Sequence, residues 1–413
     1  LIGSLTMINR ISLSLLVSIL SFCTAETNSN PEAAPNQERP HFVNTTKPNF
    51  QIVADKNLHD TALLMAGLAL DKQSNPELIT ISQSASFKTH KDSLGSSFSR
   101  AEQKRLSSMK EWSEKELADV CKQGNDLFYP FSGPDIMTAH AIFPCAKDYI
   151  MIGLEPAGVP PHIQKMNETT RARYFAAIRN SLGSILNYSF FRTNDMRDDF
   201  QGVLDGLTPI LMVFLAREGN EIIAARVVTL LPDQSVIERD YNQPATEQEK
   251  KTESTGVRGI RFYFKDAKDQ RLKTVTYFSV DISDSGLVNR DYFLKTIATT
   301  GSYTTYLKSA SYLMHRDSFS KIRSFILDNS DHVIEDDSGI PLSFFTDTNW
   351  AKSYYGMYTK PIPLFAARYQ SDLRAIFKDT KKNHVQPLPF GTGYNYQEGD
   401  SHLLVARKNI LKK

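Results

Sequence analysis

The feature that most constrains the fold of this chain is the grouping of its helical and extended patterns. Apolar residues recur at helical spacing in residues 99–120 and 167–191, whereas short apolar or alternating runs at 149–154, 221–231 and 260–264 indicate strands. Helices and strands come in blocks rather than in strict alternation, which is typical of α+β proteins. We therefore expect an α+β fold with a largely antiparallel sheet and packed helices, in one or two lobes.

The other segments are assigned from the same patterns. The unbroken apolar run at 209–217 is expected to be a strand that forms a hairpin with 221–231. Residues 303–313 are expected to be a helix. Further helices are expected at 58–70, 290–299, 317–327 and 373–377, and further strands at 274–282, 332–336 and 403–406.

Composition sets the broad class. The chain has 413 residues, of which 41% are hydrophobic and 23% charged, so it can bury a full core. These values exclude a disordered chain and a polytopic membrane protein. The net charge of +2 gives no long-range field, and the phosphate-binding glycine loops are absent, so we expect no nucleic-acid partner.

The start of the chain resembles a secretory signal. After Met7, Arg10 supplies a positive charge and residues 11–22 form an apolar stretch, which suits a signal segment of roughly 7–15 apolar residues better than a membrane span of about 20. We expect residues 1–25 to be removed after Ala25. The product would be exported, to the periplasm or in association with the outer envelope.

A lipid anchor is the alternative to simple cleavage. Residues 20–23 resemble a bacterial lipobox that ends at Cys23, although Phe22 stands where that motif has a small residue. Two cysteines would remain in the cleaved chain, Cys121 and Cys145. Export permits a disulfide between them, and two buried thiols are the other reading.

The remainder is divided by composition. Residues 26–50 are polar and proline-containing and are expected to be a tether. Residues 51–231 and 257–413 are expected to be the N-terminal and C-terminal parts of a globular unit. The polar segment 232–256 between them is expected to be a flexible insertion.

Several strings occur together along this unit. They are YPFSGPD at 129–135 and GLEP at 153–156, followed by related segments at 306–315, 336–341 and 355–362. The combination resembles a family of exported bacterial proteins often labelled hypothetical proteins or lipoproteins. The resemblance covers about residues 58 to 408 and implies bacterial export. The family has no established activity, so the resemblance assigns no catalytic residue.

Four carboxylates are the candidates for catalysis. Asp135 lies in a proline–glycine turn, Glu155 follows a buried strand, and Asp336 and Asp337 follow another strand. An apolar surrounding would raise the pKa of one acid into the range of a proton donor, while a second activates water. The alternative is that these acids cap helices, close turns or form ion pairs.

Four further residues are candidates for ligand binding. Tyr129 and Tyr358 lie in loops rich in glycine and proline, and aromatic-lined loops suit carbohydrate or peptide ligands. They also suit anchoring of the loops in a core. His140 and His315 lie close to the strings, but no zinc-binding spacing is present, so no metal or cofactor is expected.

Two functions follow from these observations. We expect an exported envelope protein that binds an unidentified envelope ligand or protein without catalysis. The alternative is an exported hydrolase that uses carboxylates. The two differ in geometry, since a hydrolase needs its acids in one cleft, about 5–10 Å apart for glycoside chemistry.

Overall fold

The structure is a computed structural model that describes residues 52–190, 203–309 and 312–409. The expected signal segment, residues 1–25, the tether at 26–50 and the alternative anchor at Cys23 lie outside the described residues.

The described residues form one ten-stranded sheet, in the order β4-β3-β5-β6-β2-β1-β7-β8-β10-β9. The strands are β1 (Asp126–Tyr129), β2 (Asp148–Gly153), β3 (Glu221–Leu230), β4 (Val236–Asp240), β5 (Val257–Lys265), β6 (Leu272–Ser279), β7 (Tyr303–Leu307), β8 (Ser330–Glu335), β9 (Trp350–Gly356) and β10 (His402–Lys408). Five of the nine pairings are antiparallel, at the two flanks. The four parallel pairings join β6, β2, β1, β7 and β8 in the centre. The α+β class is confirmed, and a single sheet runs through both parts of the chain.

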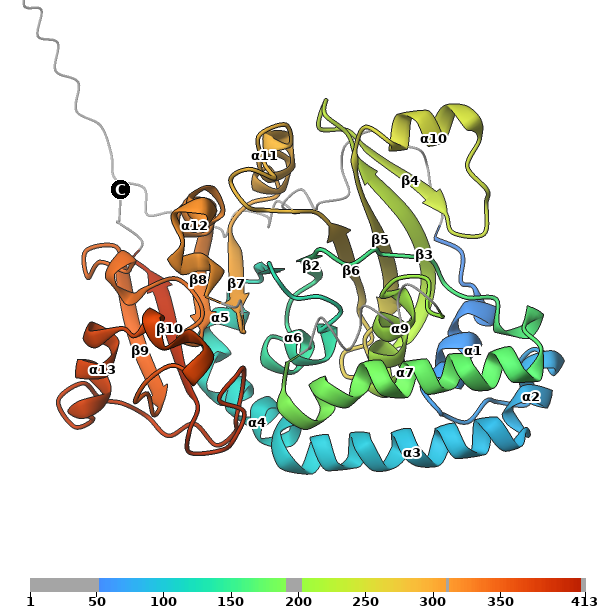
Figure 1. Ribbon diagram of the computed structural model, residues 1–413, viewed down its shortest axis with the longest axis horizontal. Helices are drawn as coiled ribbons and strands as arrows, with labels where there is room; N and C mark the ends of the chain where they lie inside the picture. Colours follow the sequence, from blue (N-terminus) through green and yellow to red (C-terminus); the bar gives the residue numbers. More distant parts are fainter. Residues whose placement is uncertain (1–51, 191–202, 310–311, 410–413) are drawn as a thin grey trace, which may run out of the picture. The chain divides into compact units, whose positions relative to one another are not determined.

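Helices cover both faces of this sheet (Figure 1). The first face carries α1 (Lys56–Met65), α2 (Pro76–Ser82), α3 (Ala85–Ala101), α4 (Ser107–Glu116), α5 (Ala118–Lys122), α6 (Ile136–Ile142), α7 (Glu168–Tyr188) and α9 (Thr208–Arg217). The second carries α11 (Asp291–Ala298), α12 (Ser320–Asn329) and α13 (Ser371–Lys378). Each face has its own core of buried apolar residues, as expected for a sheet covered on both sides.

Regular periodicity produced the accurate assignments. In α7, Phe175, Ile178, Leu182 and Ile185 are all buried, and the Asn167 side chain caps the first turn by accepting a bond from the Thr170 amide at 2.9 Å. The helix expected at 99–120 is present in pieces, because a π-helical turn at Glu102–Leu106 separates α3 from α4.

Two assignments were wrong. Residues 209–217, expected to be a strand, belong to helix α9, in which Thr208 to Ala216 are all buried. A segment that is apolar on every side carries no periodicity, so pattern alone does not separate a buried helix from a buried strand. Residues 303–307, expected to begin a helix, are strand β7, which is paired on both sides by β1 and β8.

The segment 232–256, expected to be a flexible insertion, contains β4 and helix α10 (Glu247–Glu253). Thr246 and Glu249 form a reciprocal capping box at the start of α10. Regular structure therefore begins inside a stretch whose composition indicates only polarity.

Cys121 and Cys145 are joined by a disulfide, with their Cα atoms 5.5 Å apart. This decides between the two readings of the cysteine pair. In the chain-entropy model, closing a loop of this length stabilises the fold by roughly 3 kcal/mol. Among the described residues, no helix has the length and apolarity needed to cross a bilayer.

The connections diverge at the middle of the sheet. From β1 the chain passes through α6 to β2, on one side, whereas from β7 it passes through α12 to β8, on the other side. β1 and β7 are adjacent, so their carboxyl ends form a topological switch point. Ligands of α/β sheets bind in the crevice outside such a point. This edge is therefore where a functional site is expected.

Candidate functional site

The loops after β1, β7 and β8 bring polar side chains together at the carboxyl-terminal edge. The loop after β1 carries Asp135, β7 is followed by Lys308, and β8 is followed by Asp336 and Asp337. All four side chains are buried. Three of the four carboxylates that the sequence indicated are thus on neighbouring loops.

Asp135 and Lys308 form a buried ion pair. One oxygen of Asp135 accepts a bond from the Thr138 amide at 3.1 Å and so caps α6, while the other accepts from Lys308 Nζ and from the Tyr129 hydroxyl at 3.3 Å. Burial lowers the pKa of Lys308, and the charge of Asp135 opposes this effect. Because both oxygens of Asp135 are occupied, its observed role is to cap α6 and neutralise Lys308.

Asp336 closes the turn after β8. It accepts bonds from the Ser338 amide at 3.0 Å and hydroxyl, and from the Ser309 amide at 3.4 Å. A Cβ atom at Gly393 would lie 2.0 Å from Asp336 Oδ2, and the φ angle of this residue is positive. Both features favour glycine at position 393. Burial raises the pKa of Asp336 against the effect of these bonds.

Asp337 has a different set of neighbours. Its Oδ2 accepts a bond from the Tyr312 hydroxyl at 2.7 Å, and its Oδ1 lies 3.8 Å from His402 Nε2. Burial, together with the charge of Asp336, raises the pKa of Asp337 to about 7. Burial also raises the pKa of Glu335 well above its usual value. These acids hold protons in a range where exposed carboxyls are ionised.

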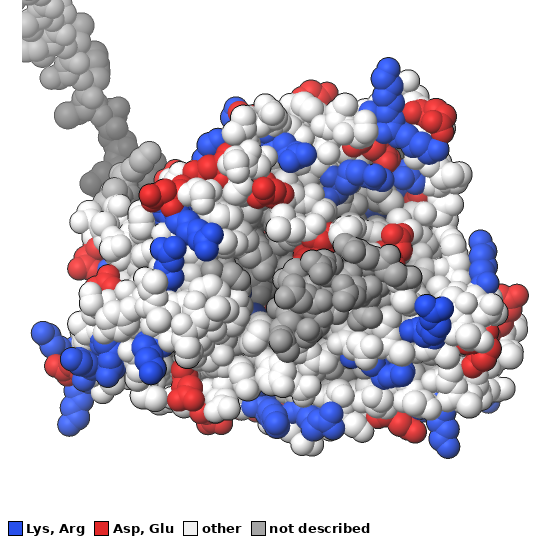
Figure 2. All heavy atoms as spheres, in the orientation of Figure 1, with Lys and Arg blue, Asp and Glu red and all other residues white. Residues whose placement is uncertain are grey.

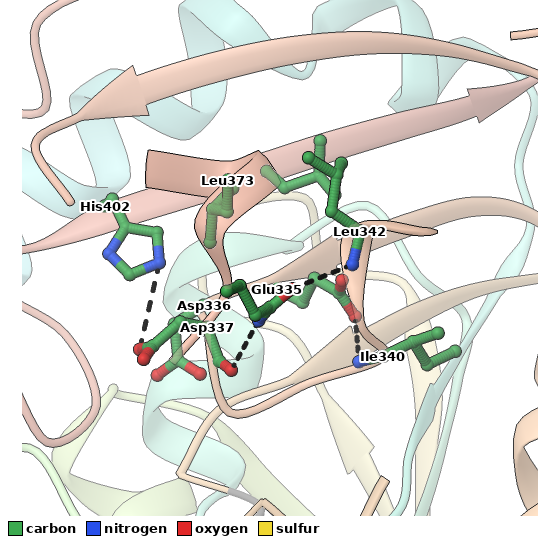
Figure 3. Close-up of a pocket in the computed structure, with 9 residues that line it drawn as sticks. Glu335, Asp336, Asp337, Ile340, Leu342, Leu373 and His402 are labelled. Atoms are coloured by element: carbon green, nitrogen blue, oxygen red, sulfur yellow. Dashed lines mark hydrogen bonds and ion pairs between the residues drawn. The ribbon is translucent and has the colours of Figure 1, made fainter. Parts of the chain in front are cut away.

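A small cavity lies between these acids and β10 (Figure 3). Its volume is about 10 Å³, which is about the space that one water molecule needs. In Figure 3, His402 points toward Asp337 from one side, while the Glu335 carboxylate turns toward the Ile340 amide, which it binds at 2.8 Å. The residues that line the cavity are Glu335, Asp336, Asp337, Ile340, Leu342, Gln370, Leu373, His402 and Leu404.

An open cleft of about 440 Å³ lies next to this cavity. Gln370 lines both spaces and donates to the main-chain oxygen of Asp337 at 3.2 Å, and His315 lines the cleft and donates to the same oxygen at 3.1 Å. Arg368 also lines the cleft and has no ion-pair partner among the described residues. The full lining is His315, Pro341, Ser343, Ala367, Arg368, Tyr369, Gln370, Ser371 and Asp372.

The predicted ligand-binding residues are distributed unevenly around this edge. His315 lines the cleft, and burial lowers its pKa to about 4. The ring of Tyr358 packs against His402 with centroids 4.9 Å apart. Tyr129 is buried against Tyr306 beneath the Asp135–Lys308 pair. Of the four, His315 alone is among the cleft residues.

Glu155 and His140 do not join this group. Glu155 follows β2 and is half-buried, and the Tyr277 hydroxyl donates a hydrogen bond to its main-chain oxygen at 2.8 Å. His140 lies between Glu218, at 2.9 Å, and Asp266, at 2.8 Å, near the start of β6. The convergence expected of a four-acid hydrolase is therefore partial.

Sequence reasoning missed Lys308 and His402. Lys308 lies within the segment 303–313, which was expected to be a helix, so its place directly after a strand was hidden. His402 stands at the start of β10, whose register with β8 pairs Leu404 with Glu335 and so places His402 beside Asp337. The signal available was the buried strand expected at 403–406, one residue after this histidine.

The described residues contain no group of three or more His, Cys, Asp or Glu side chains arranged to hold a metal ion. Comparison of the chain with family models, with curated proteins and with solved structures finds no match. The functional argument therefore rests on the geometry of this edge.

Proposed function

We propose that the protein is an exported envelope protein of bacteria that binds a polar ligand bearing an anionic group in the cleft beside Arg368, without catalysis. The observation that carries the proposal is the position of the Arg368 guanidinium in an open polar cleft. None of the described residues forms an ion pair with it. A guanidinium offers five donors to a carboxylate or phosphate. Asp372, on the same lining, would favour ligands that also carry hydroxyl or amine donors.

The position of the cleft supports the same function. Its walls come from the segments that follow β7 and β8, from the segment between β9 and α13 that carries Arg368, and from the start of α13. They lie at the edge where parallel sheets bind ligands. On the face shown in Figure 2, basic and acidic side chains are interspersed. The described residues of that face form no basic stripe of the kind that binds nucleic acid.

Two observations support export. The leader pattern at 1–25 is typical of secreted chains, and the Cys121–Cys145 disulfide is stable in oxidising compartments. Thiol titration of denatured protein purified from the bacterial envelope should detect neither cysteine. Titratable thiols at both positions would argue for a reducing compartment and against export.

Ligand binding is tested by thermal shift and calorimetry on residues 26–413. The probes are inorganic phosphate, citrate and soluble peptidoglycan fragments. A probe at about a hundredfold excess over its Kd should stabilise the protein by roughly 2.7 kcal/mol. The shift should disappear in Arg368→Gln. It should persist in the matched control Arg290→Gln, which changes an exposed arginine directly before helix α11. A shift that survives Arg368→Gln would place the ligand elsewhere.

A hydrolase is the second candidate, and the protonated state of Asp337 favours it. A carboxyl with a pKa of about 7 is suited to donate a proton near neutral pH. Turnover of chromogenic esters or glycosides that falls at least about a hundredfold in Asp337→Asn would support this candidate. It would also contradict the non-catalytic proposal. Binding without turnover leaves the first proposal in place.

A further inference from the structure

His402 is a buried histidine at the start of β10. Its side chain is 2% exposed, and within the described structure neither ring nitrogen has a hydrogen-bond partner. Burial lowers its pKa to about 3, so the ring is neutral at physiological pH, with one donor and one acceptor. Leaving such groups unpaired in the interior is unfavourable, and proteins usually satisfy them with ordered water.

The space beside this ring has the size and polarity for one water. His402 Nε2 and Asp337 Oδ1 are 3.8 Å apart, which is too long for a direct hydrogen bond. Both residues line the cavity of about 10 Å³, together with the polar side chains of Glu335, Asp336 and Gln370. A buried water needs two to four polar partners, and this cavity offers them.

We propose that one water molecule occupies this cavity and bridges His402 Nε2 to Asp337 Oδ1. The water completes the hydrogen bonding of the imidazole and holds the Asp337 side chain from the side opposite Tyr312, which binds the other oxygen. The inference does not depend on the proposed function, because it concerns the cavity and not the ligand of the cleft.

The bridge also positions the wall of the cleft. The main-chain oxygen of Asp337 accepts bonds from His315 and Gln370, and both of these side chains line the cleft. Loss of the water would therefore affect the cleft through Asp337. The titratable groups that face Asp337 are Tyr312, His402, Asp336 and Tyr358. Among the described residues, no lysine or arginine lines the cavity.

The water is tested by ¹⁷O magnetic relaxation dispersion, which counts long-lived internal waters. His402→Phe keeps a ring and removes both nitrogens, and should lower the count by one. The control His162→Phe changes an exposed histidine and should leave the count unchanged. Equal counts in His402→Phe and the native chain would overturn the proposal.

A crystal structure of the native chain gives an independent test if His402→Phe does not fold. Density for one water within hydrogen-bond distance of both atoms is expected. An empty cavity would overturn the proposal, and so would a metal ion bound at about 2.0–2.2 Å.

The positioning role has a spectroscopic readout. The side-chain ¹⁵N resonances of His315 should shift in His402→Phe. In the conservative variant His402→Asn they should return toward native values, because the asparagine amide can bind the same water. They should be unchanged in His162→Phe. Unchanged His315 resonances in His402→Phe would overturn the link between the cavity and the cleft.

Discussion

A partly buried histidine, His140, and a buried one, His402, lie at opposite edges of the same sheet, and their charge states differ. His140, near the start of β6, is enclosed by Glu218 and Asp266, and Lys273 Nζ lies 2.8 Å from Asp266. Burial alone would lower the pKa of His140, but the two carboxylates outweigh it and raise the pKa to about 9. His402, beside Asp337 after β8, has a pKa lowered to about 3.

The difference follows from the balance of buried charges. Around His140, two carboxylates face one lysine and one imidazolium, so every buried charge has an opposite neighbour. Around His402, Glu335, Asp336 and Asp337 are crowded together, and Lys308 is already paired with Asp135. Acids without a cation keep their protons instead of ionising. In the first cluster each charge has a neighbour of opposite sign, whereas the second holds an imidazole that makes no hydrogen bond to the described residues, beside a cleft.

The largest expected effect on the free energy of unfolding is in the cluster around His140. Lys273→Met removes a buried cation, leaves Asp266 partly uncompensated and should lower the free energy of unfolding by about 3–5 kcal/mol. Lys268→Met, in the turn between β5 and β6, changes a lysine that is 71% exposed. It should lower the free energy of unfolding by less than about 0.5 kcal/mol. Urea unfolding measures both. Equal costs would show that the cluster is not a tightly coupled unit.

The acidic cluster should make stability depend on pH in the opposite sense to ordinary acids. The pKa of Asp337 is about 7 in the folded chain, against a usual value of 3.8, so the folded state holds a proton that the unfolded state releases. Its contribution is complete below pH 4 and is lost as the pH rises through 7. The loss is on the order of 4 kcal/mol at most.

Asp337→Asn is the variant that isolates this effect. The difference in unfolding free energy between the native chain and Asp337→Asn should change in favour of the variant between pH 4 and 8. Parallel stability curves for the two proteins would contradict the protonated state of Asp337.

His140 should contribute in a neighbouring pH window. Its pKa is about 9 in the folded chain, against a usual 6.5, so its contribution is complete below pH 6.5 and is lost as the pH rises through 9. The difference between the native chain and His140→Gln should shrink across this window by roughly 3 kcal/mol. His162→Gln, which changes an exposed histidine, is the matched control. A constant difference for His140→Gln would refute the charged imidazole.

The smallest effect is expected at Glu155, which belongs to neither cluster. Glu155→Gln keeps the size and a hydrogen-bond acceptor and should change the free energy of unfolding by less than about 0.5 kcal/mol. Urea unfolding of the variant and the native chain measures the difference. A loss comparable with that of Lys273→Met would mean that Glu155 is coupled to the buried charges.

Part of the candidate site could be predicted from sequence. Asp135, Asp336 and Asp337 stand in turns after buried strands, and such acids are recognisable from their local context. Lys308 could not be recognised, because its partner Asp135 is 173 residues away and its strand was expected to be a helix. His402 could not be recognised either, because its place beside Asp337 depends on the register of β10 with β8.

The sequence by itself determined the elements whose apolar residues recur with a clear period, such as α7, and the α+β class, because periodicity is a local property of the chain. The tertiary structure alone decided that residues 208–217 are helical, that 303–307 are a strand, and that the centre of the sheet is parallel. It also decided the protonation of Asp337 and His140. Each of these depends on contacts between segments distant in sequence, since pairing selects a strand and the balance of burial and neighbouring charge sets a pKa.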